Sequence, residues 1–197
     1  MPKSPFINPF CMGHTEGISA DEALRRLKEG NIRFVSPEGY SGDISEKRRS
    51  FLAENGQHPF AAVVTCSDSR VIPEIIFDAG FGDIFVIRSA GNVVDGCTLG
   101  SLEYAVGHMG CNLVLVLGHT NCGAIAEAIK GFHEGHSIEI INDICCGIGC
   151  EKDPVKASKL NLRNSVRLID EDLGERHGVR VVGALYDIRS GTVEFDI

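Results

Sequence analysis

Two short stretches decide the fold: Thr65-Cys66-Ser67-Asp68-Ser69-Arg70 and Gly118-His119-Thr120-Asn121-Cys122-Gly123. The apolar runs before them, residues 60–64 and 113–117, are short and continuously hydrophobic, which is typical of buried strands in a parallel sheet. Polar residues therefore follow the carboxyl ends of two strands, where open α/β sheets bind their ligands. Cys66, His119 and Cys122 supply two thiolates and one imidazole, a ligand set typical of a catalytic zinc with an open fourth position.

Strands and helices alternate along the rest of the chain. Further strands are predicted at residues 84–87 and 179–185, with a short edge strand at 192–195. Ser19 and Glu22 match the capping box that opens a helix. Other helices are predicted at residues 45–54, 73–77, 98–109, 124–129 and 155–173, while residues 138–150 are ambiguous. The predicted fold class is therefore α/β: a mostly parallel β-sheet of four strands plus a short edge strand, flanked by helices.

The length and composition indicate one domain. A chain of 197 residues, 43% of them hydrophobic, can bury a sizeable core. Residues 1–18 hold three prolines without periodicity and are predicted to form an N-terminal arm, followed by a single α/β domain at residues 19–197. The buried side of the long helix at 155–173 is expected to consist of Leu160, Val166, Leu168 and Ile169.

Charge and hydropathy exclude several classes of protein. The net charge of −8 and the scattered basic residues argue against a nucleic-acid-binding surface. No apolar run approaches the roughly 20 residues that a membrane-spanning helix needs. The N-terminus lacks the basic and apolar segments of a secretory signal. We therefore expect a soluble, cytoplasmic protein that binds neither nucleic acid nor membrane.

Eight cysteines are many for a chain of this length. The alternation of strands and helices favours metal binding or free thiols over a disulfide framework. Cys97 and Cys111 are expected to pack as small apolar residues, and Cys11 lies in the predicted arm. The three cysteines in the glycine-rich segment leave two alternatives, a second metal or redox site and, more strongly favoured, a loop with incidental thiols: Cys145, Cys146 and Cys150.

Several motifs occur together in one order. They are Leu27-Lys28-Glu29-Gly30-Asn31, Cys66-Ser67-Asp68-Ser69-Arg70-Val71, Gly82-Asp83-Ile84-Phe85, Arg88 with Ala90-Gly91-Asn92, Ser101-Leu102-Glu103-Tyr104-Ala105, and Gly118-His119 to Cys122-Gly123. From about Ala20 onward the chain resembles the β-class carbonic anhydrases. The resemblance implies Zn²⁺ on Cys66, His119 and Cys122, with Asp68 and Arg70 as the catalytic dyad. It also implies a homodimer or a dimer of dimers, with the active site at the subunit boundary.

The same resemblance implies the substrate-binding residues. Gln57 falls where plant-type members carry an active-site glutamine, and three residues fall where such members line an apolar CO2 pocket: Phe85, Ala90 and Tyr104. Gly123, which lets the backbone approach the metal, belongs to the same predicted site. Another subgroup carries a tryptophan that helps to bind bicarbonate, at the position of Val63 here. The chain has no Trp, so the resemblance favours the plant-like, non-allosteric type.

The predicted function is the reversible hydration of CO2 to bicarbonate by a zinc-bound hydroxide, the reaction of a carbonic anhydrase. Asp68, ionised beside Arg70, can accept the hydrogen bond of that hydroxide. A structural salt bridge is the alternative for this pair, and Asp68 released from Arg70 could become a fourth zinc ligand. Two alternative functions are hydrolysis of COS or CS2 on the same fold and a non-catalytic zinc-binding subunit.

Overall fold

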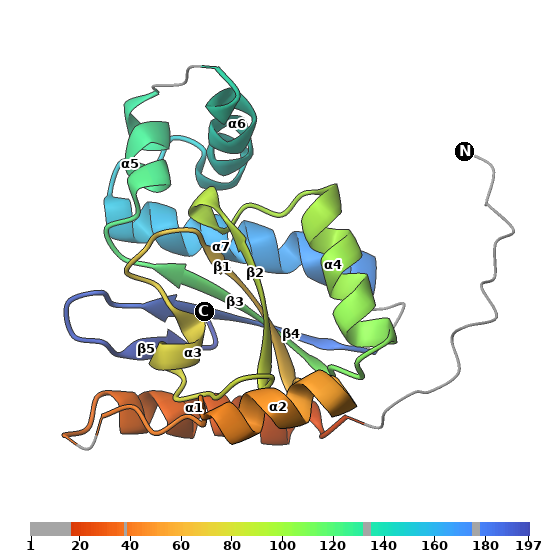
Figure 1. Ribbon diagram of the computed structural model, residues 1–197. Helices are drawn as coiled ribbons and strands as arrows, with labels where there is room; N and C mark the ends of the chain where they lie inside the picture. Colours follow the sequence, from red (N-terminus) through yellow and green to blue (C-terminus); the bar gives the residue numbers. More distant parts are fainter. Residues whose placement is uncertain (1–16, 38, 132–134, 175–177) are drawn as a thin grey trace, which may run out of the picture.

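One five-stranded sheet carries the fold (Figure 1). The computed structural model describes residues 17–37, 39–131, 135–174 and 178–197. The strands lie in the order β2-β1-β3-β4-β5, and only β5 runs antiparallel to its neighbour. Their bounds are Ala61–Cys66 for β1, Ile84–Ser89 for β2, Leu113–His119 for β3, Arg180–Tyr186 for β4 and Val193–Phe195 for β5. This confirms the predicted class of four parallel strands plus a short edge strand.

Helices cover both faces of the sheet, as Figure 1 shows. Their bounds are Ala20–Phe34 for α1, Glu46–Asn55 for α2, Pro73–Ile76 for α3, Gly96–Gly107 for α4, Gly123–Lys130 for α5, Ser137–Ile148 for α6 and Pro154–Ile169 for α7. A 3-10 turn, η1 (Ala90–Asn92), follows β2, and a π turn, η2 (Asp170–Gly174), follows α7. The predicted elements are therefore present, with small shifts at their ends.

Alternation along the central strands divides the core into two layers. Val63 and Leu115 face the layer that α1 and α3 cover, whereas Val64 and Val116 face the layer that α4 and α7 cover. Successive side chains of a strand point to opposite faces, so a strand buried on both faces needs an unbroken hydrophobic run. This explains why β1 and β3 were recognisable from the sequence.

The helix α1 begins at the predicted cap. The Ser19 hydroxyl accepts a hydrogen bond from the Glu22 backbone N–H at 3.2 Å. The Glu22 carboxylate accepts hydrogen bonds from Arg25 and Arg26 on the outer face of the helix. The inner face of α1 buries Leu24 and Leu27.

Two predictions about helices hold only in part. Residues 137–148 form the regular helix α6, so Cys145 and Cys146 lie on a helix rather than in a loop. On α7, Ile169 alone of the four predicted residues is fully buried. The other residues of its buried face are mostly small or polar: Ala157, Ser158, Asn161, Leu162 and Ser165. Asn161 and Ser165 are polar because these two residues lie against the backbone of η1.

Of the two cysteines predicted to pack as small apolar residues, one is buried and one is exposed. Cys111 is buried as predicted, and burial raises the pKa of its thiol to about 12. Cys97 is exposed, against prediction, because it lies in the first turn of α4 on the side that faces solvent. Cys11 and most of the predicted arm, residues 1–16, lie outside the described residues. None of the helices in the described ranges has the length and apolar character needed to cross a bilayer.

Candidate metal centre

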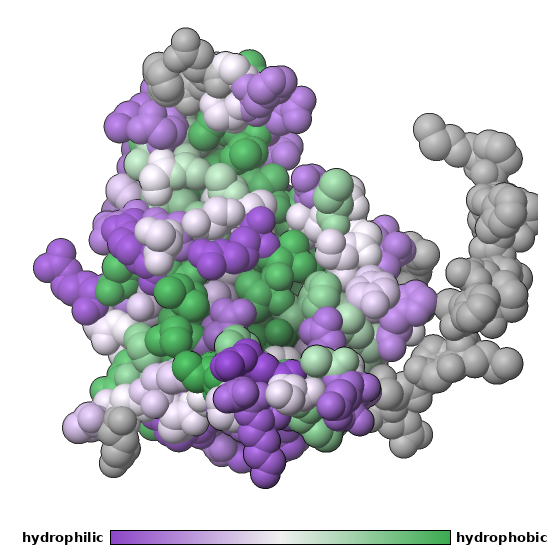
Figure 2. All heavy atoms as spheres, viewed as in Figure 1, coloured by the Kyte–Doolittle hydropathy of each residue, from purple (hydrophilic) through white to green (hydrophobic). Residues whose placement is uncertain are grey.

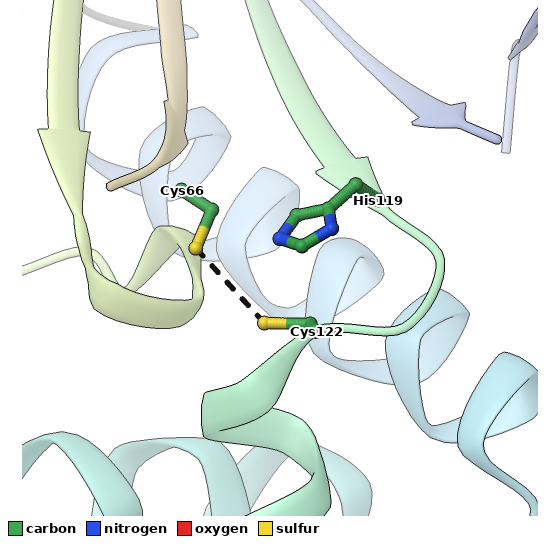
Figure 3. Close-up of side chains that lie close together, drawn as sticks. All are labelled: Cys66, His119 and Cys122. Atoms are coloured by element: carbon green, nitrogen blue, oxygen red, sulfur yellow. Dashed lines mark hydrogen bonds between the residues drawn. The ribbon is translucent and has the colours of Figure 1, made fainter. Parts of the chain in front are cut away.

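Three side chains converge at the carboxyl edge of the sheet (Figure 3). Cys66 is the last residue of β1, His119 is the last residue of β3, and Cys122 caps the start of α5. All three residues are buried, and their candidate ligand atoms lie within 4.8 Å of one another. The structure therefore brings together the predicted metal ligands, and the described residues hold no other such group.

The tautomer of His119 leaves one ring nitrogen for a ligand. Nδ1 lies 2.9 Å from the carbonyl oxygen of Thr120, which can only accept, so Nδ1 carries the proton and donates. Nε2 is buried and has no hydrogen-bond partner among the described residues. An unpaired buried nitrogen is costly in free energy, and coordination to a metal ion would satisfy it.

The two thiols form a tight pair. The sulfur atoms of Cys66 and Cys122 lie 4.0 Å apart. Their hydrogen bond is the largest cause that lowers the pKa of Cys66, and backbone N–H groups at 3.3 and 3.4 Å lower it further. The bond with Cys66, followed by burial, raises the pKa of Cys122. One thiolate is thus favoured without help, whereas the second needs a cation, which fits a metal site.

Asp68 faces this centre while paired with Arg70. The carboxylate accepts two hydrogen bonds from the guanidinium, at 2.9 Å from Nε and 2.7 Å from Nη2. These bonds hold the pKa of Asp68 well below its usual range. Asp68 Oδ2 lies 4.0 Å from Nε2 of His119. The carboxylate is therefore close to the three candidate ligands, with both oxygens engaged by Arg70.

Arg88 belongs to one of the motifs quoted above, but the sequence analysis assigned it no role in the site. From β2 its guanidinium donates to the backbone carbonyls of Asp68 and Val71, at 2.8 and 2.9 Å. Arg70 in turn donates to the carbonyl of Asn121 at 3.1 Å. These bonds join the loop after β1 to β2 and to the loop after β3. The sequence offers no signal for them, because their acceptors are backbone atoms.

Comparisons with known proteins bear on this site. A family model described as carbonic anhydrase matches residues 61–149. Carbonic anhydrase 2 of Mycobacterium tuberculosis is 48% identical over 113 residues, 57% of this chain and 54% of that protein. A carbonic anhydrase of Mycolicibacterium smegmatis is 45% identical over the same shares. The chain thus spans about half the length of the curated relatives it matches.

Solved structures agree with the sequence matches. The Coccomyxa β-carbonic anhydrase in complex with acetazolamide has a TM-score of 0.62 and 25% identity, over 79% of this chain and 86% of that chain. The β-carbonic anhydrase CcaA has a TM-score of 0.60 and 26% identity, over 88% and 91%. The chain is thus similar to carbonic anhydrases in sequence over residues 61–149, and its fold is similar to that of β-class carbonic anhydrases.

Of the residues assigned to substrate through the resemblance to β-class carbonic anhydrases, two lie beside the metal centre. Ala90 follows Ser89, the register partner of Cys66, and so lies next to the end of β1. Gly123 is the first residue of α5, directly after Cys122. Both positions are compatible with a role near the reacting atoms.

The other three lie elsewhere in the chain. Gln57 is exposed and precedes β1, whereas Cys66 ends that strand, so the two lie at opposite edges of the sheet. Phe85 precedes Ser89 by four residues on β2, about 13 Å along the strand. The Tyr104 ring lies 6.4 Å from the Phe85 ring and the residue is 50% exposed. Within one chain these residues do not reach the metal centre.

Proposed function

We propose that the protein is a zinc-dependent carbonic anhydrase that interconverts CO2 and bicarbonate at the centre formed by Cys66, His119 and Cys122. One observation carries the proposal: three buried ligand atoms lie within 4.8 Å of one another, with a carboxylate beside them that is held by Arg70. The names of the curated relatives support the same reaction.

The donor set fits zinc. Two thiolates and one imidazole are typical zinc ligands, and three protein ligands leave a fourth position for chemistry. Asp68 would be a competent fourth ligand, but its oxygens are engaged by Arg70. The position therefore stays open to substrate or water. A purely structural zinc closes its coordination with protein ligands, which argues against a non-catalytic zinc-binding subunit.

Each remaining residue has a role that follows from its contacts. A bound Zn²⁺ would lower the pKa of water and so supply hydroxide for attack on the carbon of CO2. Asp68, kept ionised by Arg70, can only accept a hydrogen bond, and it thereby orients the reacting O–H group. Arg70 restrains the carboxylate through a two-point contact, and its bond to Asn121 ties this contact to the loop after β3.

A second copy of the chain completes the pocket in this proposal. The three distant substrate residues lie near β2, which has a neighbour on one side only among the described strands. Figure 2 shows hydrophobic side chains gathered over this side of β2, between α2 and α4. Exposed large hydrophobic residues on the flanking segments include Phe51, Phe81 and Tyr104. A homodimer through this face would cover them and bring Gln57, Phe85 and Tyr104 toward a partner's metal centre.

Stopped-flow measurement of CO2 hydration, with zinc quantified per chain, tests the proposal. We expect about one zinc per chain and a rate of CO2 hydration that falls to background in metal-stripped protein and returns with Zn²⁺. COS and CS2 serve as comparison substrates and should react more slowly. A protein that binds one zinc per chain and does not hydrate CO2 would overturn the proposal.

A further inference from the structure

The turn η1 delivers a hydrogen bond to a candidate metal ligand. The backbone N–H of Gly91 donates to Sγ of Cys66 at 3.3 Å. Gly91 and the following Asn92 both have left-handed backbone conformations, with φ of 65° and 49°. A Cβ on Gly91 would lie 2.7 Å from the Ile144 side chain, so the turn also packs closely against α6. Glycine adopts this conformation freely, but it costs free energy at Asn92, so the turn needs contacts that hold it in place.

Two side chains of α7 hold this turn by its carbonyl groups. Asn161 Nδ2 donates to the carbonyl of Gly91 at 2.8 Å, and the Ser165 hydroxyl donates to the carbonyl of Asn92 at 3.1 Å. The Asn92 side chain donates back to Ser165 at 3.3 Å. Asn161 and Ser165 are each 3% exposed and lie four residues apart, on one face of the helix. Successive residues of the turn are thus tied to successive turns of α7.

Asn161 and Ser165 are polar because this part of α7 contacts the carbonyl groups of η1. Where α7 meets the sheet layer, its buried residues are Leu162 and Ile169. Burying an amide costs free energy unless its hydrogen bonds are made, so Asn161 and Ser165 are favourable only where acceptors face them. Here the acceptors belong to the two residues that follow Ala90.

We propose that Asn161, assisted by Ser165, is a positioning residue for the metal centre. By fixing the carbonyl of Gly91 it holds the turn so that the Gly91 N–H points at Cys66 Sγ. That hydrogen bond fixes the position of the sulfur and orients it toward the metal, as outer contacts of metal ligands do. The inference rests on the proposed function only in taking zinc as the bound ion.

The test compares two asparagines of the same helix. Asn161→Leu keeps the shape of the side chain and cannot donate to Gly91. Asn164→Leu is the matched control, because Asn164 is partly exposed and its carbonyl oxygen accepts from Arg167 on the surface. We expect Asn161→Leu to weaken Zn²⁺ binding about tenfold to a hundredfold in competition with a chelator, the range usual for outer contacts of metal ligands. Asn164→Leu should bind as the wild type does.

A spectroscopic readout separates positioning from general stability. The sulfur-to-metal absorption of the Co²⁺-loaded protein should change in Asn161→Leu and stay unchanged in Asn164→Leu, with both chains folded by circular dichroism. If Asn161→Leu does not fold, Ser165→Ala decides, and it should cause a smaller change in the same direction. A folded Asn161→Leu, or in its place Ser165→Ala, with wild-type affinity and an unchanged Co²⁺ spectrum would overturn the inference.

The measurement also separates this inference from the proposed function. Wild-type protein that binds zinc and does not hydrate CO2 would contradict the proposed function, and the affinities would still decide the role of Asn161. Wild-type protein with no metal at Cys66 would contradict both. Normal hydration together with unchanged metal affinity in Asn161→Leu would contradict the positioning role alone.

Discussion

The carboxyl ends and the amino ends of the parallel strands, called here the carboxyl edge and the amino edge of the sheet, differ in whether one chain alone assembles its predicted site residues. At the carboxyl edge, Cys66, His119 and Cys122 are buried together, and Asp68 is fixed by Arg70. At the amino edge and along β2, the substrate residues implied by the resemblance are exposed or half-buried: Gln57, Phe85 and Tyr104. One chain therefore brings the three candidate ligands together by itself. In our proposal, Gln57, Phe85 and Tyr104 contact substrate only at the metal centre of a second chain.

The largest expected effect breaks the carboxyl-edge centre itself. Cys122→Ala should lose zinc and bring CO2 hydration to background, because two ligands cannot hold the ion as three do. Cys111→Ala is the matched control, since Cys111 is equally buried and lies outside the centre. Metal content by atomic absorption and stopped-flow hydration give the comparison. Zinc retained in Cys122→Ala and lost in Cys111→Ala would place the centre elsewhere.

A smaller effect is expected when the ligands stay and the orienting carboxylate changes. Asp68→Asn should reduce kcat/KM for CO2 hydration by about 10²-fold, within the range of positioned proton acceptors, and should leave zinc bound. Lys159→Ala, which removes the surface ion pair with Glu194, is the control and should leave the rate unchanged. Wild-type hydration by the zinc-loaded Asp68→Asn protein would remove Asp68 from the mechanism.

The pH dependence of CO2 hydration tests how strongly a zinc ion at the carboxyl edge acidifies its water. Hydration should rise several-fold from about pH 7 to pH 9, because two thiolates offset the charge of Zn²⁺ and acidify water less than three histidines, for which the pKa is about 7. Asp68 does not set this rise, since Arg70 lowers its pKa and the carboxylate is ionised throughout. Measured kcat/KM should therefore rise with similar shape in Asp68→Asn. A wild-type profile already flat across this range would contradict the expectation.

The smallest effect is expected at the amino edge. Gln57→Ala should lower kcat/KM about tenfold, the effect of losing about one hydrogen bond to substrate. It should keep one zinc per chain, because Gln57 is remote from the ligands of its own chain. Asn55→Ala, an exposed amide at the end of α2, is the control. Loss of zinc in Gln57→Ala would show that the two edges are not separate.

The sequence predicted the carboxyl edge of the sheet better than it predicted the amino edge. Continuous hydrophobic runs identified β1 and β3, and these strands place Cys66 and His119 at their ends, so the grouping of the candidate metal ligands could be predicted from local pattern. The buried polar residues of α7 could not, because a turn backbone is their partner and hydropathy does not record it. Tyr104 and Gln57 carried no signal of their own, and only the family resemblance assigned them a role.

A hybrid dimer tests most directly whether the two edges form one site across two chains. Gln57→Ala chains keep the metal centre, and Cys66→Ala chains keep Gln57. Differently tagged chains can be mixed by subunit exchange, and the hybrid isolated through both tags. In the hybrid, the metal centre of the Gln57→Ala chain faces the intact Gln57 of its partner. One of the two sites is then complete, and we predict that it hydrates CO2. If the pure hybrid dimer hydrates CO2 no faster than the Gln57→Ala homodimer, the two edges do not form one site across two chains.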